Sequence, residues 1–230
     1  MNIPETEKPR VVVIGGGFGG ISITRKLLNK DVQLVLIDKR NYHSLQPLLY
    51  QVSTSGLEPD SIAFPLRKFL NKSNNGYFRM AEVNTIDADE QTINTNIGSL
   101  NYDYLVIATG SKTNFFGNEN IESNAVWMKS IPQALNLRSL IFENLEQASI
   151  TADKEKRKSL LTFVIAGAGP TGVELSGAIA ELRNHIITKD YKDFKASEIE
   201  IHLLEGAERI LPPMSKDSST DAQKYLEKMG

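Results

Sequence analysis

The chain has 230 residues, with 26 lysines and arginines against 28 aspartates and glutamates, and its formal net charge is −2. This balance argues against a nucleic-acid-binding protein, whose binding surface is usually basic. There is no cysteine and only three scattered histidines, so disulfides, thiolate metal sites and cysteine nucleophiles are excluded and no metal site is predicted. Any redox chemistry would therefore need a bound cofactor.

The length suggests one large domain or two small ones, and 40% hydrophobic residues suffice for a packed core. The N-terminus lacks the apolar segment of a signal peptide, and no early stretch is long and apolar enough for a spanning helix. We therefore expect the chain in the cytoplasm.

The first predicted element is a buried strand that leads into a glycine-rich turn and a helix. It reads R-V-V-V-I-G-G-G-F-G-G-I-S-I-T-R-K-L-L. The spacing Gly15-x-Gly17-x-x-Gly20 provides a tight turn, a backbone bare enough for a pyrophosphate, and a close helix–strand contact. The phosphate would rest on the helix N-terminus. The next strand, residues 32–37, ends at Asp38, which is placed to bind the hydroxyls of an adenosine ribose.

The elements that follow are predicted to be short and mixed. The pattern predicts a helix at 61–72, strands of a small β insertion at 77–87 and 91–96, and a buried strand at 104–108.

An amphipathic helix is predicted at 132–147, and a charged linker at 151–158. The apolar side of the helix is assigned to Leu135, Leu140, Phe142 and Leu145. The basic cluster in the linker is interpreted as a solvated loop without a partner.

A second glycine turn repeats the plan of the first: L-T-F-V-I-A-G-A-G-P-T-G-V-E-L-S-G. Gly167-x-Gly169-x-x-Gly172 again follows a strand and opens a helix, and the next strand ends at Glu205. The longer interval before Glu205 is explained by a helix extension plus loop at 184–196. Either both turns bind nothing and are structural, or one chain binds two dinucleotides; two matches in full context favour the second interpretation.

This order of motifs resembles the flavoproteins with two dinucleotide-binding domains, in which FAD occupies the first site and a nicotinamide nucleotide the second. Three segments are similar to type II NADH dehydrogenases, the single-subunit NADH:quinone oxidoreductases: I-D-K-R-N-Y-H-S-L-Q-P-L-L-Y-Q-V-S-T, Y-L-V-I-A-T-G and A-G-A-G-P-T-G-V-E-L-S-G. The resemblance implies an α/β fold with two Rossmann-like domains, each a parallel sheet with flanking helices, and a small β insertion. An FAD-binding domain is expected in 1–113 and an NAD(H)-binding domain in 114–230.

The missing cysteines narrow the choice within this superfamily. Disulfide reductases place a cysteine pair beside the flavin, and sulfide:quinone oxidoreductases also work through cysteines, so both are excluded. Reductases of ferredoxin or rubredoxin remain an alternative, as does an inactive nucleotide-binding fragment.

The resemblance also implies roles for individual residues. In the FAD site, Val83 would meet the adenine and residues 46–48 would lie along the isoalloxazine. The residues expected to hold FAD are Gly15, Gly17, Phe18, Gly19, Gly20, Asp38, Lys39, Arg40, Gln46, Pro47, Leu48, Val83, Ala108, Thr109 and Gly110. NADH would be held by a second set: Gly167, Gly169, Pro170, Thr171, Gly172, Glu174 and Glu205. Glu174 is the candidate catalytic residue, orienting NADH or transferring a proton, and His43 is interpreted as structural.

The last predicted element is a helix at 215–229 with Gly230 as its C-cap. It leaves the second domain without a third strand, and we therefore expect a fragment of a longer flavoenzyme. The quinone site and the membrane-binding helices would lie outside the fragment. The resemblance implies a parent enzyme peripheral on the inner face of the cytoplasmic membrane, for which a homodimer is one possible state.

Overall fold

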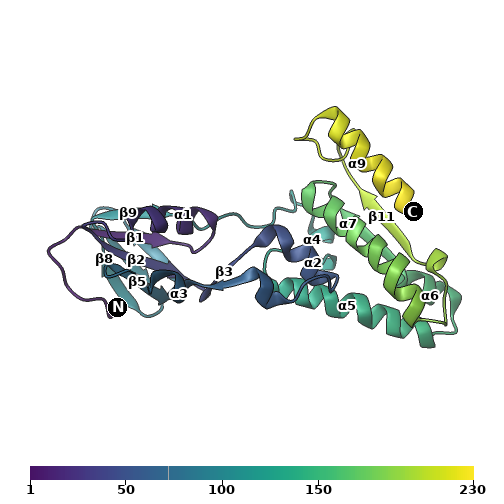
Figure 1. The fold of residues 1–230 in the computed structure, drawn as a ribbon, viewed down its shortest axis with the longest axis horizontal. Coiled ribbons are helices and arrows are strands. Elements are labelled where there is room, and N and C mark those ends of the chain that lie inside the picture. The colour runs from purple at the N-terminus through teal and green to yellow at the C-terminus, as the bar shows by residue number, and fades with distance from the viewer. Residues whose placement is uncertain (72) are drawn as a thin grey trace. The chain divides into compact units, whose positions relative to one another are not determined.

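The computed structural model describes residues 1–71 and 73–230. The chain divides into two compact units, and Figure 1 shows the course of the chain by colour. The first unit comprises Met1–Leu45 and Ile62–Asn114, and the second comprises Gln46–Ser61 and Phe115–Gly230. Residues 46–61 thus pack with the second unit, although they precede most of it in the sequence.

The first unit is built on a four-stranded parallel sheet with the order β5-β2-β1-β9. Its strands are β1 (Arg10–Ile14), β2 (Gln33–Asp38), β5 (Gly76–Met80) and β9 (Tyr104–Ile107). Residues 34–37 of β2 are fully buried, as expected for a central parallel strand that is covered on both faces.

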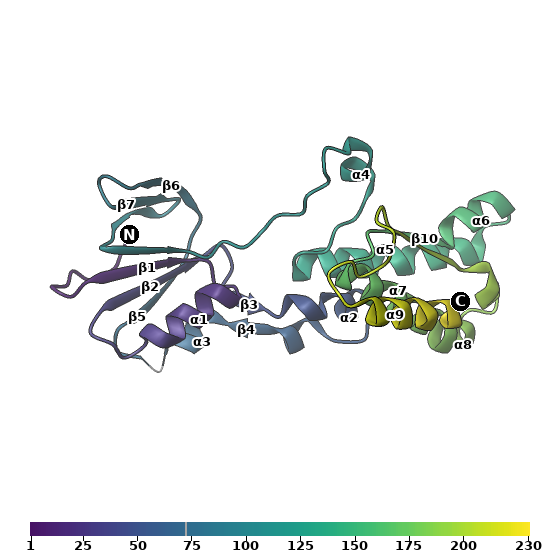
Figure 2. The same ribbon diagram turned by 90° about the horizontal axis from the view of Figure 1, so that it is seen from above.

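The two faces of this sheet carry different layers, as Figure 2 shows. Helices α1 (Phe18–Leu27) and α3 (Leu66–Leu70) pack on Val13, Leu34 and Leu36. Val12, Val35 and Ile37 instead face an antiparallel sheet of three strands: β6 (Val83–Asp87), β7 (Thr92–Thr95) and β8 (Gly98–Asn101). The alternation along β1 and β2 therefore fills two separate cores. A short hairpin-like pair, β3 (Tyr42–Ser44) with β4 (Ala63–Pro65), completes the unit.

The second unit has a two-stranded parallel sheet, β10 (Thr162–Ala166) with β11 (Glu200–Leu204). Helices α5 (Ile131–Ile150) and α7 (Pro170–Leu182) contribute Ile141, Leu145 and Ile179 to its core. The other helices are α2 (Leu49–Ser53), α4 (Glu119–Asn124), α6 (Lys154–Leu160), α8 (Thr188–Asp190) and α9 (Lys216–Met229), with a π-helical turn at Arg183–Ile187. The predicted α/β class with parallel sheets is thereby confirmed.

Two local predictions in the first unit were wrong. The helix expected at 61–72 is confined to α3, because Ala63–Pro65 pairs with Tyr42–Ser44 as strand β4; Lys72 lies outside the described residues. The strand expected at 77–87 is two strands, of which β5 joins the main parallel sheet and only β6 belongs to the insertion. Both errors arose because strand pairing is a long-range property.

Two predictions in the second unit also need correction. The buried face of α5 is Ile131, Ala134, Ile141, Leu145 and Ala148, whereas Leu140 is exposed. The linker expected at 151–158 contains helix α6, whose N-terminus is capped by Asp153 accepting hydrogen bonds from the amides of Glu155 and Lys156. The many charged residues in this segment favoured the prediction of a linker, although Asp153 is an ordinary N-cap residue for a helix.

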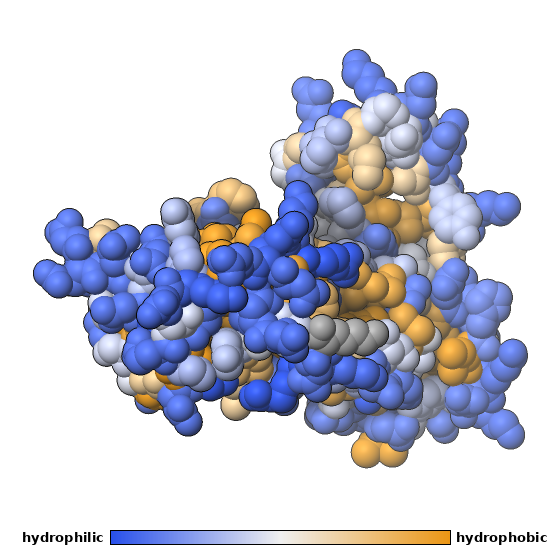
Figure 3. All heavy atoms as spheres, turned by 60° about the vertical axis from the view of Figure 1, so that its left-hand side comes forward, coloured by the Kyte–Doolittle hydropathy of each residue, from blue (hydrophilic) through white to orange (hydrophobic). Residues whose placement is uncertain are grey.

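Figure 3 shows hydrophobic side chains reaching the surface among hydrophilic ones. The exposed apolar residues include Val164 and Leu204 on the strands of the second unit, and Tyr104 and Ile107 on β9. The strand expected at 104–108 is therefore present as β9, but the prediction that it is buried was wrong. None of the described helices combines the length and apolar character needed to span a bilayer.

Candidate nucleotide-binding sites

The turn between β1 and α1 can be made only with glycine at two of its positions. Gly15 has a φ of +106°, its amide donates to Ile37 O at 2.7 Å, and a Cβ there would lie 2.3 Å from Ala108 O. A Cβ on Gly20 would lie 1.7 Å from Gly15 O. The positive φ and the Ala108 backbone therefore exclude a side chain at Gly15, and the close approach of α1 to the turn excludes one at Gly20.

Gly17 in the same turn has the opposite character. Its φ of −76° is ordinary for any residue, and no atom lies within 4 Å of a Cβ built there. Gly17, Phe18 and Gly19 are exposed at the N-terminus of α1, where no side chain caps the helix and the first turn carries no acid. The free amides and the helix dipole thus face open space, which fits a bound phosphate.

Asp38 fixes this turn from the end of β2. Its Oδ2 accepts a hydrogen bond from the Gly16 amide at 2.6 Å, and its Oδ1 accepts one from the Arg40 amide at 2.7 Å. Lys39 pairs at 2.5 Å with exposed Glu82, the residue before Val83 at the start of β6. Asp38, Lys39 and Arg40 therefore lie at the carboxyl end of the sheet. Val83 directly follows Glu82, the residue that pairs with Lys39.

Residues 108–110 lie against the same turn. The Ala108 amide donates to Ile14 O at 2.8 Å, and Ala108 and Thr109 supply the backbone atoms nearest to a Cβ on Gly15. Gly110 follows with a φ of +74°.

The turn between β10 and α7 repeats this design in the second unit. Gly167 has a φ of +100° and donates to Leu204 O at 2.8 Å, and a Cβ on Gly172 would lie 2.0 Å from Gly167 O. Gly169 again has no atom within 4 Å of a Cβ. Pro170 and Thr171 begin a helix whose first turn holds no acid.

Glu205 occupies the place in the second unit that Asp38 occupies in the first. Its Oε2 accepts from the Ala168 amide at 2.8 Å and its Oε1 from the Ala207 amide at 3.0 Å. The backbone amides of Ala207 and Ala168 lower the pKa of Glu205 below its ordinary value of 4.5. The carboxylate is thus held in its ionised form at the edge of the turn.

We expect this hydrogen bonding to make the stability of the second unit depend on acid pH. Because the pKa of Glu205 is lowered by folding, its contribution is present above the unfolded pKa and lost as pH falls through the folded pKa. Urea midpoints measured from neutral pH to about pH 3 should fall less steeply for Glu205→Gln than for the wild type. Glu208→Gln, which removes a nearby exposed carboxylate, is the control for the loss of one negative charge in this segment.

Glu174 lies on α7 and faces a groove of about 850 Å³. The groove is formed within the second unit by α2, α7 and α9, and its lining includes Tyr50, His185 and Tyr225. Partial burial raises the pKa of Glu174 above its ordinary 4.5. A carboxyl group with a raised pKa is suited to carrying a proton, so its catalytic role remains a prediction with physical support.

Gln46, Pro47 and Leu48 form a short 3₁₀ turn. This turn belongs to the second unit, whereas the first glycine turn belongs to the first unit. The Gln46 side chain donates to Lys129 O at 3.4 Å. Their expected role along the isoalloxazine remains a prediction, as does the assignment of cofactors to 1–113 and 114–230.

Sequence reasoning did not predict three contacts that hold the glycine turns, although it interpreted His43 as structural. Leu66 packs against Gly16, where a Cβ would lie 2.5 Å from its Cδ1. His43 Nδ1 is 2.9 Å from Gly16 O, and the Leu211 amide donates to Ala168 O at 2.8 Å. Their distance along the chain from the turns left no local signal for the contact.

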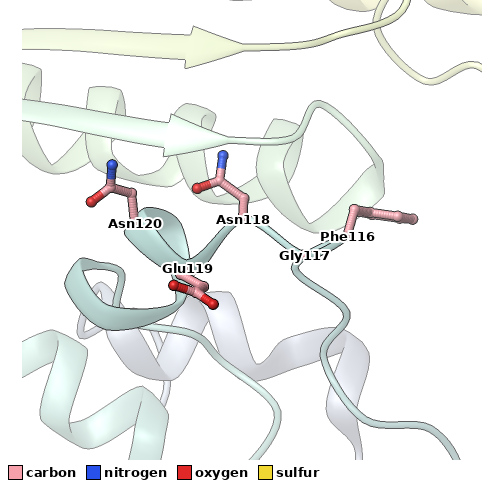
Figure 4. A pocket seen from close by; sticks show the side chains of 5 residues that line it. All are labelled: Phe116, Gly117, Asn118, Glu119 and Asn120. Atoms are coloured by element: carbon pink, nitrogen blue, oxygen red, sulfur yellow. The ribbon is translucent and has the colours of Figure 1, made fainter.

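A further hollow of about 510 Å³ is lined by residues 116–120, at the start of α4 (Figure 4). The Asn118 side chain accepts from the Ile121 amide at 3.1 Å and so caps the helix. In Figure 4 the Phe116 ring points away from the asparagines, and it is 90% exposed. With five consecutive residues as its lining, this hollow lacks the converging groups of a nucleotide site.

The two turns and their acids match a known protein family over nearly the whole chain. Residues 9–230 match the model for pyridine nucleotide-disulphide oxidoreductases. The chain belongs to the pyridine nucleotide-disulphide oxidoreductase family.

The chain is similar in sequence to a type II NADH:quinone oxidoreductase of Mycobacterium tuberculosis. It is 40% identical to this chain, over 96% of the chain and 48% of its own length. NDH2 from Plasmodium falciparum, solved in complex with NADH, has a TM-score of 0.90 and 28% identity, covering 97% of this chain and 47% of its own.

Similarity extends more weakly to an NADH:rubredoxin oxidoreductase of Clostridium acetobutylicum, with a TM-score of 0.68 and 18% identity, over 96% of this chain and 51% of that one. That likeness concerns the fold alone. The chain spans about half the length of the curated relatives it matches.

Proposed function

We propose that this chain is the nucleotide-binding part of an FAD-dependent NADH:quinone oxidoreductase of type II. The observation that carries the proposal is the pair of glycine turns, each with one position that is bare and open, at Gly17 and Gly169. Each turn opens onto a helix N-terminus without an acid in its first turn. The names of the similar proteins, several of which are NADH:quinone oxidoreductases, support the choice of substrates.

The residues present fit two dinucleotides. A Cβ at Gly17 or Gly169 would enter otherwise open space in front of free helix amides, which is where a pyrophosphate needs bare backbone. We assign the first turn to FAD, with Asp38 at the ribose, and the second to NADH, with Glu205 at the ribose. Bound FAD would accept a hydride from NADH and pass two electrons to a quinone.

The protein's own contribution would be placement and proton handling. Each turn would hold the diphosphate of its own nucleotide. Glu174, whose pKa is raised by burial, would carry a proton near the nicotinamide side. We propose that the whole enzyme is peripheral at the inner face of the cytoplasmic membrane, because quinones dissolve in the bilayer.

The test is reconstitution with FAD of the whole enzyme, of which this chain is the nucleotide-binding part, followed by anaerobic addition of NADH and then of a quinone. We expect stoichiometric flavin, bleaching of the flavin absorbance by NADH, and its recovery with quinone. Recovery with ferredoxin or rubredoxin but not with quinone would contradict the assignment of the acceptor. A protein that binds no flavin would contradict the proposal as a whole.

Gly169→Ala is the matched variant for the second site. The added methyl group meets no protein atom, so the fold should be kept while the NADH site is blocked. We expect this variant to retain flavin and to resist bleaching at NADH concentrations that bleach the wild type.

A further inference from the structure

The central residue of the first glycine turn, Gly16, is held through each of its polar groups. Its amide donates to Asp38 Oδ2 at 2.6 Å, and its carbonyl oxygen lies 2.9 Å from His43 Nδ1. Since a carbonyl oxygen can only accept, the imidazole donates from Nδ1. Gly16 is buried and its Cα packs against Leu66.

The second unit holds the corresponding residue in the same way, but with a different donor. The Ala168 amide donates to Glu205 Oε2 at 2.8 Å, and its carbonyl accepts from the Leu211 backbone amide at 2.8 Å. Ala168 is completely buried. In both turns a carboxylate accepts from the central amide and a donor binds the central carbonyl oxygen. The donor is the His43 side chain in the first turn and the Leu211 main-chain amide in the second.

The carbonyl that His43 holds belongs to the peptide that leads into Gly17. In a trans peptide the C=O and N–H bonds point in opposite directions, so fixing Gly16 O also fixes the direction of the Gly17 amide. The Gly17 amide therefore points away from His43. It belongs to the residue whose Cβ position is open. The direction of a free donor at the phosphate cradle thus depends on the imidazole.

His43 is itself well supported for this task. It lies in β3, where it pairs with Phe64 of β4, and it is partly buried. Its ring meets Phe18, the first residue of α1, edge to face at 5.0 Å and 84°. A side chain fixed from both sides loses little entropy when it donates to Gly16.

We infer that His43 is a positioning residue of the FAD site, whose Nδ1–H donates to Gly16 O and so aims the Gly17 amide at the pyrophosphate. The inference rests on the proposed function, since it takes the first turn to be the FAD turn. It predicts that the donor, rather than the aromatic ring, carries the effect.

Three variants separate the donor from the ring. Asparagine places an N–H donor close to the position of Nδ1, leucine has the same size without a donor, and phenylalanine keeps a ring for Phe18. We expect His43→Leu and His43→Phe to raise the dissociation constant for FAD at least about tenfold, a loss of about 1.4 kcal/mol. His43→Asn should remain within about threefold of the wild type.

The measurements are FAD titration by flavin fluorescence and, on the flavin-free protein, ¹⁵N NMR of the neutral imidazole, which should carry its proton on Nδ1. Equal FAD affinity of the leucine and asparagine variants would overturn the inference, and so would a neutral ring protonated on Nε2. A wild-type protein that shows the Nδ1–H form but binds no FAD would overturn the assignment to FAD together with the proposed function. The NMR result distinguishes the two failures, because it needs no flavin.

Discussion

Gly20→Ala is expected to unfold the first unit, whereas Gly17→Ala should leave it folded and abolish flavin binding. A Cβ on Gly20 would lie 1.7 Å from Gly15 O, a backbone atom that cannot move without breaking the turn. We expect a loss of at least about 3 kcal/mol in the free energy of unfolding, the upper range for overpacking. Gly17→Ala should cost less than about 1 kcal/mol, because its backbone is ordinary and its surroundings are open.

The two variants differ from the wild type by one methyl group each, and they are therefore matched. Urea unfolding followed by circular dichroism measures the first effect, and flavin retained after gel filtration measures the second. Gly172→Ala, with its Cβ 2.0 Å from Gly167 O, should reproduce the Gly20 result in the second unit. A folded Gly17→Ala protein with wild-type flavin content would contradict the assignment of the first turn.

The second large effect is expected in the choice between NADH and NADPH. Glu205 is exposed at the end of β11, with its charge fixed by the Ala168 and Ala207 amides. It can accept a hydrogen bond from a ribose 2′-hydroxyl and would repel a 2′-phosphate. A penalty of about 2–3 kcal/mol corresponds to a preference for NADH of roughly thirty- to 150-fold in binding.

The hydrogen bonds of Arg209, a cation close to Glu205 in the sequence, strengthen this expectation. The Arg209 guanidinium donates to the carbonyl oxygens of Pro212, Met214 and Ser215. With its N–H groups donating to these carbonyl oxygens, Arg209 is not placed to neutralise a 2′-phosphate beside Glu205. Dissociation constants for the two nucleotides should converge in Glu205→Gln, while Asp38→Asn in the other unit should leave their ratio unchanged. Equal binding of NADH and NADPH by the wild type would contradict the role of Glu205.

Much of both turns was predictable from sequence, because the requirements that define them are local. A glycine at a positive φ, a β-branched strand before it and an apolar helix after it are all neighbours along the chain. The structure gives Gly15 and Gly167 that positive φ, and it places Asp38 and Glu205 at the ends of the next parallel strands. The helix predicted at 215–229 is confirmed as α9, with Ser215 as its N-cap and Gly230 as its C-cap.

The sequence alone did not determine which distant segments complete those turns. The donors on Gly16 O and Ala168 O come from His43 and Leu211, and neither lies in the glycine pattern. Likewise, residues 76–80 became a strand of the main sheet through pairing with β2, and α5 buries the face that meets the second core. These features depend on packing between segments far apart in the chain, whose energy no local pattern contains. The sequence by itself therefore determined where two nucleotide turns form, and the tertiary structure decided which side chains hold them in a shape that can bind.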